Sequence, residues 1–175
     1  MVREIQIEKA LITDAQLISD LSIVTFIETY RGTCSDSDLD SFIETCFNET
    51  HIAEELSGEV PQYFIAYADG FPAGYIRIFE DYNDYPAIPI YKAIELKRIY
   101  VLENYHSQKV GAALMTYALQ LARNRAYEAL WLGVWEENLR GLAFYNKFGF
   151  EDTGCRHTFY IGTTAQTDHW MIKLL

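Results

Sequence analysis

Hydrophobic and polar residues recur along the chain with two different periods, and the changes of period mark the expected elements. In the first half they predict a strand, two helices and a hairpin, at residues 3–12, 14–30, 39–58 and 63–79. The buried face of the first helix is expected to carry Leu17, Leu21, Val24 and Phe26 or Ile27. The hairpin is the clearest of these elements, because two β-rich runs flank a turn that begins Asp69-Gly70.

The second half alternates strands with helices after a long loop over residues 80–93. The expected elements are a strand, a helix, an almost wholly apolar strand, a short helix ending at Gly149 and two final strands, at residues 95–102, 107–126, 129–135, 138–150, 156–162 and 169–175. A strand–loop–helix–strand order implies parallel central strands joined by a right-handed crossover. The predicted fold class is therefore α/β, with a mixed, mostly antiparallel central sheet, parallel central strands and flanking helices.

Length and charge limit what such a fold can do. A chain of 175 residues suits one domain, which we place over residues 1–175. The net charge of −11, from 25 acidic and 14 basic residues, argues against nucleic-acid binding and favours a cationic small molecule. The sequence has neither a membrane-spanning apolar run nor a signal peptide, so a soluble, cytoplasmic protein is expected. Its three widely spaced cysteines indicate neither a disulfide framework nor a metal site.

The stretch RIYVLENYHSQKVGAALMTYALQLA has the layout of a phosphate-binding loop, in which a strand leads through a short turn into a helix. A helix N-terminus presents unpaired N–H groups and a partial positive charge, and together these bind phosphate. None of the residues from His106 to Ala113 is proline, so each can donate its N–H. Gly111 is the only glycine, and Lys109 would have to tolerate the other position where glycine is usual.

Two motifs resemble those of the GCN5-related N-acetyltransferase superfamily. The loop HSQKVG corresponds to the superfamily's Gln/Arg-x-x-Gly-x-Gly/Ala, with His106 and Lys109 as departures. The stretch NLRGLAFYNKFGF fits Asn-x-x-Ala-x-x-Phe/Tyr-Tyr-x-Lys-x-Gly-Phe, with Gly141 where alanine is usual. Residues 131–175 are also similar to the C-terminal part of bacterial spermidine/spermine N-acetyltransferases. The resemblance covers nearly the whole chain and implies the acyl-CoA N-acyltransferase fold.

The resemblance implies acetyl-CoA as the acetyl donor. Its pyrophosphate would lie on the loop from His106 to Gly111 and its pantetheine arm beside the strand before it, paired like an added strand. Lys147 could reach the 3′-phosphate or could simply complement the end of its helix. The residues expected to contact the cofactor are Ile99, Tyr100, Val101, His106, Ser107, Gln108, Lys109, Val110, Gly111, Ala112, Asn138 and Lys147.

Acetyl transfer to an amine requires a proton donor for the departing thiolate and an acceptor for the proton of the ammonium group, whose pKa is about 10. The resemblance implies that Tyr145 is the acid, because it occupies the position from which the superfamily's tyrosine reaches the sulfur. Glu95, which opens the central strand, is the expected base. Glu80 and Asp81 are the alternatives for the base.

The acceptor is predicted to be a small cationic amine, in particular a polyamine. Residues expected to line its site are Glu28, Tyr30, Glu80, Asp81, Tyr82, Tyr85 and Trp135. Trp131 shares a strand face with Trp135, and at least one of the two is expected to pack in the core. A protein lysine or N-terminus as the acceptor, and a non-catalytic acyl-CoA-binding module, are the rival interpretations. A homodimer is common in the superfamily, although no residue here indicates one.

Overall fold

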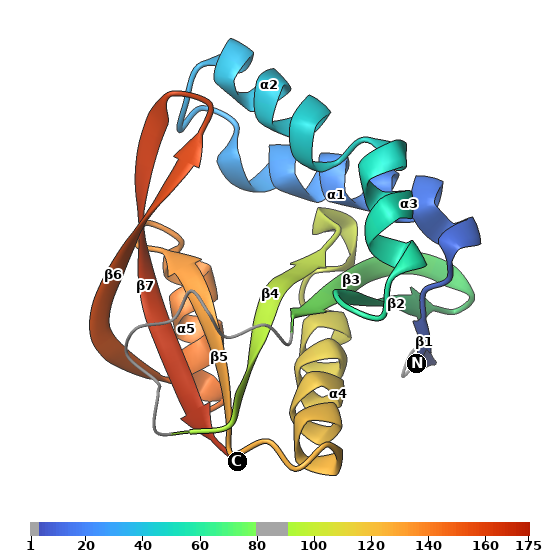
Figure 1. The fold of residues 1–175 in the computed structure, drawn as a ribbon, viewed down its shortest axis with the longest axis vertical. Helices are drawn as coiled ribbons and strands as arrows, with labels where there is room; N and C mark the ends of the chain where they lie inside the picture. Colours follow the sequence, from blue (N-terminus) through green and yellow to red (C-terminus); the bar gives the residue numbers. More distant parts are fainter. Residues whose placement is uncertain (1–3, 80–90) are drawn as a thin grey trace.

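The computed structural model describes residues 4–79 and 91–175 and contains a seven-stranded mixed sheet in the order β1-β2-β3-β4-β5-β7-β6 (Figure 1). Every pair of neighbouring strands is antiparallel except β4 and β5, which are parallel. The predicted fold class is therefore confirmed. The strands are β1 (Ile5–Lys9), β2 (Gln62–Ala68), β3 (Phe71–Phe79), β4 (Ala93–Val101), β5 (Ala129–Trp135), β6 (Glu151–Ile161) and β7 (Thr164–Leu174).

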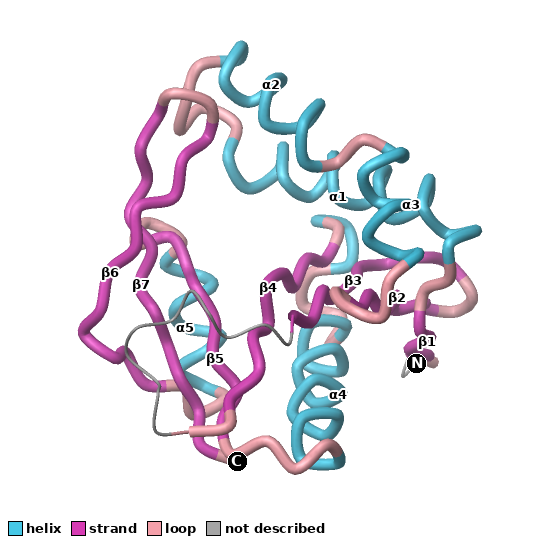
Figure 2. The backbone as a smooth tube through the Cα atoms, viewed as in Figure 1, coloured by secondary structure: helices cyan, strands magenta, loops and turns pink. Residues whose placement is uncertain are grey.

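The two parallel strands in the centre of the sheet, β4 and β5, pair with each other over a short stretch only. β4 and β5 are in register from Ala93 opposite Ala129 to Glu95 opposite Trp131. Beyond that point β4 continues along β3 as far as Val101, while β5 continues along β7 as far as Trp135. The two strands diverge as a result (Figure 2). The last residues of β4 thus have no strand partner on the β5 side within the described part of the sheet.

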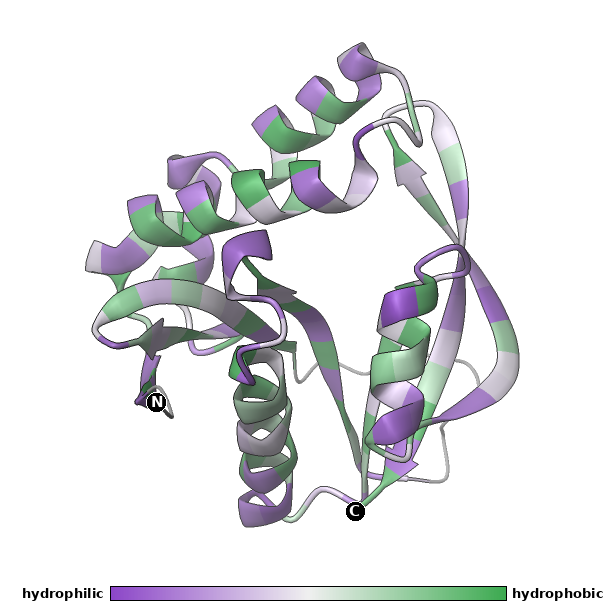
Figure 3. Ribbon diagram, turned by 180° about the vertical axis from the view of Figure 1, so that it is seen from behind, coloured by the Kyte–Doolittle hydropathy of each residue, from purple (hydrophilic) through white to green (hydrophobic). Residues whose placement is uncertain are grey.

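Helices cover both faces of the sheet. The helices are α1 (Ala15–Tyr30), α2 (Asp36–Cys46), α3 (Glu49–Ser57), α4 (Val110–Asn124) and α5 (Leu139–Lys147), with short 3-10 turns η1 (Ile12–Asp14) and η2 (Glu103–Tyr105). α4 and α5 pack in one hydrophobic core, and α1, α2 and α3 pack in two others on the opposite face. Figure 3 shows α4 and α5 from their own side of the molecule.

The buried face of α1 differs from the one predicted. Leu21 and Phe26 are buried as expected, but Val24 is 44% exposed. The polar residues Ser22 and Thr25 are buried instead, because their hydroxyl groups donate to carbonyl groups one turn earlier in the same helix, at 2.6 Å. A count of apolar positions cannot detect buried hydroxyls that are satisfied in this way.

The single helix predicted over residues 39–58 is wrong, since two helices occupy this stretch. Asn48 separates them. Its side chain donates to the Glu44 carbonyl at 2.7 Å, near the end of α2, and accepts from the His51 N–H at 2.9 Å, which caps the start of α3. Asparagine is among the preferred N-cap residues, so a break at this position follows from its chemistry.

The final hairpin is longer than predicted, and its tip is tied to α2. The Asp38 carboxylate accepts from the Thr163 N–H and the Thr164 hydroxyl, both at 2.9 Å. Gly162 makes room for this contact, because a Cβ there would overlap the Asp38 side chain. These bonds link the first helices to the far edge of the sheet. Within the described residues, no helix is long and apolar enough to cross a membrane.

Candidate active site

The loop before α4 curls so that several backbone N–H groups are left for a ligand. Ser107 and Lys109 have positive φ, at 62° and 68°. Lys109 therefore takes the left-handed conformation that glycine usually supplies, as the sequence had required of it. Consecutive residues in left- and right-handed conformations turn their N–H groups toward one side and form an anion-binding concavity. α4 begins directly after Lys109, at Val110.

Fewer of these N–H groups are available than the absence of proline had suggested. The amides of His106, Gln108 and Ala113 already donate to loop and helix carbonyls. Ser107 and Lys109, with the first three residues of α4, are the described positions left without a carbonyl acceptor. The expectation that every residue from His106 to Ala113 could donate to a ligand is thus wrong, although the remaining set still suits a pyrophosphate.

His106 has a structural position in this loop. Its Nε2 lies 2.8 Å from the Val101 carbonyl oxygen, and its Nδ1 lies 2.7 Å from a guanidinium nitrogen of Arg140. Arg140, in the first turn of α5, thereby brings a cation to the loop before α4. Arg140 was not among the predicted site residues, because its neighbour His106 is distant in the chain and no motif position marks it.

Asn138 and Lys147 lie at opposite ends of α5. The Asn138 side chain accepts from the Gly141 N–H at 2.8 Å and so caps the helix. A Cβ at position 141 would come within 2.7 Å of that side chain, which explains glycine at this position. Lys147 lies in the last turn, seven residues after Arg140 and thus about 10 Å further along the helix. Its place favours a role at the helix C-terminus over contact with the loop.

Tyr145 projects from α5 into the region where β4 and β5 diverge. It is 9% exposed and packs edge-on against Phe144 and Phe150. It also lies within electrostatic range of Tyr30 from α1, Tyr100 from β4 and Asp168 from β7. We call Tyr30, Tyr100, Tyr145 and Asp168 the tyrosine–aspartate cluster.

The environment keeps the phenol of Tyr145 protonated. Burial raises its pKa, and the charge of Asp168 raises it further. The pKa values of Tyr30 and Tyr100 are also raised, mainly by burial. The hydroxyl groups of the cluster are therefore proton donors throughout the neutral range. Tyr145 makes no hydrogen bond to another side chain in the described parts of the chain, so its hydroxyl is available to a ligand.

Asp168 is the second residue that sequence analysis missed. It lies opposite Trp135 in the pairing of β7 with β5. Its Oδ1 is buried and has no hydrogen-bond partner among residues 4–79 and 91–175. Desolvation raises the pKa of Asp168 from 3.8 to about 6, although Lys97 and His169 oppose the shift. A charged residue on the same strand face as Trp170 was the signal that could have revealed it.

Glu95, the predicted base, is buried within β4. Its side chain is 7% exposed and forms an ion pair with Lys97, at 3.1 Å. Glu95 lies in register with Trp131, at the last paired position of β4 and β5. The carboxylate is thus close to the divergence of the strands, and its charge is balanced by Lys97.

The predicted acceptor residues do not all lie together. Tyr30 is buried against Trp135, with ring centroids 5.6 Å apart, so both belong to the wall of the cluster. Trp131 instead packs against Trp170 in a separate core. Glu28 is exposed and accepts from the Glu103 N–H at 3.1 Å, which ties α1 to η2. Glu80, Asp81, Tyr82 and Tyr85 lie outside the described residues.

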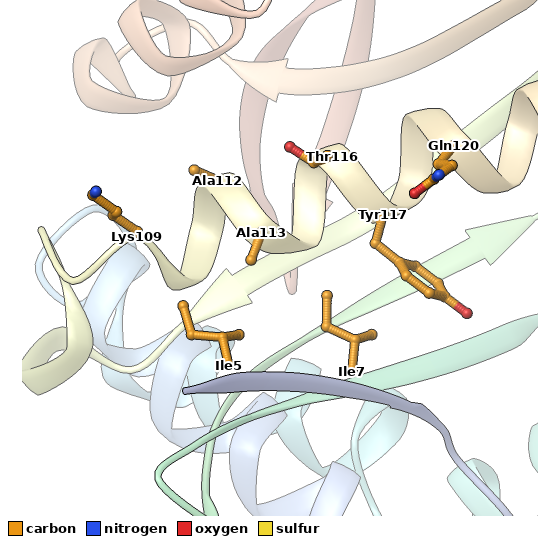
Figure 4. Close-up of a pocket in the computed structure, with 8 residues that line it drawn as sticks. All are labelled: Ile5, Ile7, Lys109, Ala112, Ala113, Thr116, Tyr117 and Gln120. Carbon is orange, nitrogen blue, oxygen red and sulfur yellow. The ribbon is translucent and has the colours of Figure 1, made fainter. Parts of the chain in front are cut away.

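A groove between α4 and β1 differs in its lining from the tyrosine–aspartate cluster. It runs between α4 and β1, from Lys109 past Ala113 to Tyr117, with Ile5 and Ile7 opposite (Figure 4). Its lining is mostly apolar and includes no carboxylate or histidine. The groove therefore offers no pair of groups for acid–base chemistry, in contrast to the tyrosine–aspartate cluster.

Several known proteins are similar to this chain in sequence or in fold. An uncharacterised N-acetyltransferase of Lactobacillus delbrueckii subsp. lactis is 29% identical over 89% of this chain and 88% of its own length. A spermidine N(1)-acetyltransferase of Thermoplasma acidophilum is 28% identical over 85% of this chain and 91% of its own length. The crystal structure of the PaiA N-acetyltransferase of T. acidophilum, solved with coenzyme A, superimposes with a TM-score of 0.80 at 22% identity, covering 98% and 99% of the two chains.

Most of the features described above lie in the part of the chain that matches a known family, and Asp168 lies beyond it. The sequence model of the Acetyltransferase (GNAT) family matches residues 24–150, a range that holds the loop before α4, Asn138 and Tyr145. It also includes both diverging strands and the helices that follow them. Since this match spans most of the chain, the protein belongs to the acetyltransferase (GNAT) family.

Proposed function

We propose that this protein transfers an acetyl group from acetyl-CoA to a primary amine of a small cationic acceptor, with polyamines as the preferred class. One observation carries the proposal. The divergence of β4 and β5 brings an anion-binding helix N-terminus, a protonated phenol and a buried carboxylate to neighbouring positions. Acetyl transfer needs a group of each kind.

The chain's residues fit acetyl-CoA. The loop amides and the guanidinium of Arg140 would hold the pyrophosphate. The N–H and C=O groups of Ile99–Val101 that face the β5 side, apart from the Val101 carbonyl near His106, would bind the amides of the pantetheine arm. When bound, acetyl-CoA supplies an acetyl group on a thioester that an amine nitrogen can displace.

Tyr145 would donate a proton to the departing sulfur. Its raised pKa keeps the hydroxyl protonated at neutral pH, so the donor is present in every molecule. The proton must be returned to the phenol from the attacking nitrogen as the amide forms. The burial of Tyr145 excludes water and strengthens these interactions.

Three features support a polyamine as the acceptor. The chain carries a net charge of −11. Residues 80–85 read EDYNDY, in which carboxylates could hold distal ammonium groups and tyrosine faces could cover methylenes. A relative is a spermidine N(1)-acetyltransferase. Protein lysines or N-termini are the alternative acceptors, which an open and less acidic site would favour.

Free-thiol release from acetyl-CoA, with mass analysis of the product, tests the proposal. The panel should contain spermidine, a neutral-bodied monoamine of similar reach and a peptide amine. We expect acetylated spermidine with the highest kcat/KM. Preference for the peptide would assign the enzyme to protein acetylation. Absence of transfer to any amine would leave only an acyl-CoA-binding module.

A further inference from the structure

Asp168 stands out among the carboxylates of the described chain because one of its oxygens is buried without a partner. Buried polar atoms in native proteins nearly always have a hydrogen-bond partner, and an unpaired buried carboxylate oxygen is costly. A donor that arrives with a ligand would satisfy it. An ammonium group is the best such donor, because it supplies both hydrogen bonds and positive charge.

The cations near Asp168 are already engaged with other carboxylates. Lys97 pairs with Glu95 at 3.1 Å, and His169 pairs with Asp152 at 3.2 Å. Tyr30 and Tyr145, the other titratable groups that face Asp168, are uncharged when protonated. Asp168 therefore keeps a negative charge without a dedicated counter-ion.

The strand beside Asp168 leaves a path to it. Gly133 is exposed, although its neighbours on both sides in β5 are buried. A Cβ at position 133 would lie 3.2 Å from Oδ2 of Asp168. The absence of a side chain there opens the carboxylate toward the place where β4 and β5 diverge. Tyr145 lies within electrostatic range of Asp168.

We propose that Asp168 receives the ammonium group of the acceptor and takes its proton before acetyl transfer. The inference rests on the proposed function and names the base of that reaction. The raised pKa of Asp168, about 6, makes this carboxylate a better proton acceptor than an ordinary aspartate. Glu95 is less suited, because Lys97 compensates its charge.

The protons balance in this scheme. Asp168 takes one proton from the ammonium group and later releases it to solvent. The freed nitrogen lone pair forms the bond to the acetyl carbon while the carbon–sulfur bond breaks. Tyr145 gives its proton to the sulfur and regains the second nitrogen proton. The products are a neutral amide and a free thiol.

Two acceptors that differ in basicity distinguish a variant that has lost proton removal from one whose site is disrupted in general. Spermidine must lose a proton first, whereas an alkoxyamine is already unprotonated at neutral pH. We expect Asp168→Asn to lower kcat/KM for spermidine by about 10²-fold or more, and to change kcat/KM for the alkoxyamine far less. Equal losses for both acceptors would make Asp168 structural and overturn the inference, as would wild-type activity with spermidine.

Glu95→Gln is the matched comparison variant, because Glu95 is the other candidate for the base. If Glu95→Gln lowered kcat/KM for spermidine far more than for the alkoxyamine and Asp168→Asn did not, Glu95 would be the base and the inference would be wrong. A binding readout independent of turnover comes from calorimetry of spermidine with each variant. We expect Asp168→Asn to weaken spermidine binding while acetyl-CoA binding stays at the wild-type level. Absence of acetyl transfer by the wild type would overturn the proposed function itself.

Discussion

Burial raises the pKa of both Tyr145 and Asp168, and the charge of Asp168 raises that of Tyr145 further. The Tyr145 hydroxyl therefore stays protonated at neutral pH, and the Asp168 carboxyl holds its proton to a higher pH than an ordinary aspartate. Tyr145 could be picked out from the sequence, because it lies in a stretch with a strong family pattern. Asp168 could not, because it lies in a strand without a motif and reaches the cluster only when β7 pairs with β5. Glu95 was predicted from its position, but its pairing with Lys97 could be seen only in the structure.

Replacing Tyr145 by phenylalanine removes the hydroxyl and keeps the ring. The ring packs against Phe144 and Phe150, so the fold and the affinity for acetyl-CoA should stay nearly unchanged. Turnover should fall by about 10²- to 10⁴-fold, the usual contribution of a positioned proton donor. Single-turnover kinetics with acetyl-CoA and spermidine measure this directly. Unchanged turnover under conditions where chemistry limits the rate would eliminate Tyr145 as the acid.

The titration of Asp168 predicts how stability responds to pH. Its pKa in the folded protein, about 6, lies above the ordinary value of 3.8. The charged form therefore destabilises the fold above about pH 6, and this cost disappears below about pH 4. Asp168→Asn should raise the free energy of unfolding at pH 7 by up to about 3 kcal/mol, with little gain near pH 4. Denaturant unfolding at both pH values provides the measurement.

Asp152→Asn is the control of opposite sign for that experiment. Its hydrogen bonds with Arg156 hold the pKa of Asp152 below the ordinary value, so its charge favours the fold above that value. The variant should lose stability at neutral pH and approach the wild type in acid. A loss of stability for Asp168→Asn at pH 7 would show that favourable contacts hold its carboxylate, contrary to our account.

At the scale of elements, the hairpin at Asp69-Gly70, the first strand and helix, and the central strand–helix–strand unit were predictable from local patterns. The split between α2 and α3 depends on the cap at Asn48, which the apolar pattern does not record. The buried face of α1 depends on hydroxyls that bond within the helix. The divergence of β4 from β5 follows from long-range pairing and has no local signature. The site forms at this divergence, so its full composition required the structure.

The start of α4 predicts a separation of stability from cofactor binding. A Cβ at Gly111 would make only ordinary contacts of 3.7 Å with Phe144 and Val101, so Gly111→Ala fits the protein alone. Gly111→Glu adds a negative charge at a helix N-terminus, which the unliganded helix tolerates well. Bound phosphates would be repelled by the same charge. We therefore expect Gly111→Glu to fold normally and to lose acetyl-CoA binding.

Calorimetry with acetyl-CoA measures the effect, and Lys109→Gly is its companion. Lys109 has φ of 68°, which glycine adopts without strain, so this variant should keep the fold. It removes one cation near the phosphates and should weaken binding only modestly. Wild-type affinity in Gly111→Glu would show that the pyrophosphate lies elsewhere.

For the whole molecule, charge is the property that links composition to the proposed acceptor. The chain has 25 acidic residues against 14 basic ones, and this excess of negative charge attracts a polycation before any specific contact is made. Such attraction is screened over about 10 Å at 0.1 M salt. We therefore expect kcat/KM for spermidine to fall as salt rises, and kcat/KM for a neutral-bodied monoamine to change less. Equal salt responses would mean that the acidity of the chain serves solubility alone.

A crystal structure of the wild-type protein with coenzyme A and spermidine would show whether both ligands bind where β4 and β5 diverge. We expect the pyrophosphate on the free amides around Lys109, the sulfur beside the Tyr145 hydroxyl and a primary nitrogen within hydrogen-bond distance of Asp168 Oδ1. Coenzyme A bound away from the divergence of β4 and β5 would contradict the account. So would a polyamine whose reacting nitrogen lies beside Glu95 while Asp168 stays unpaired.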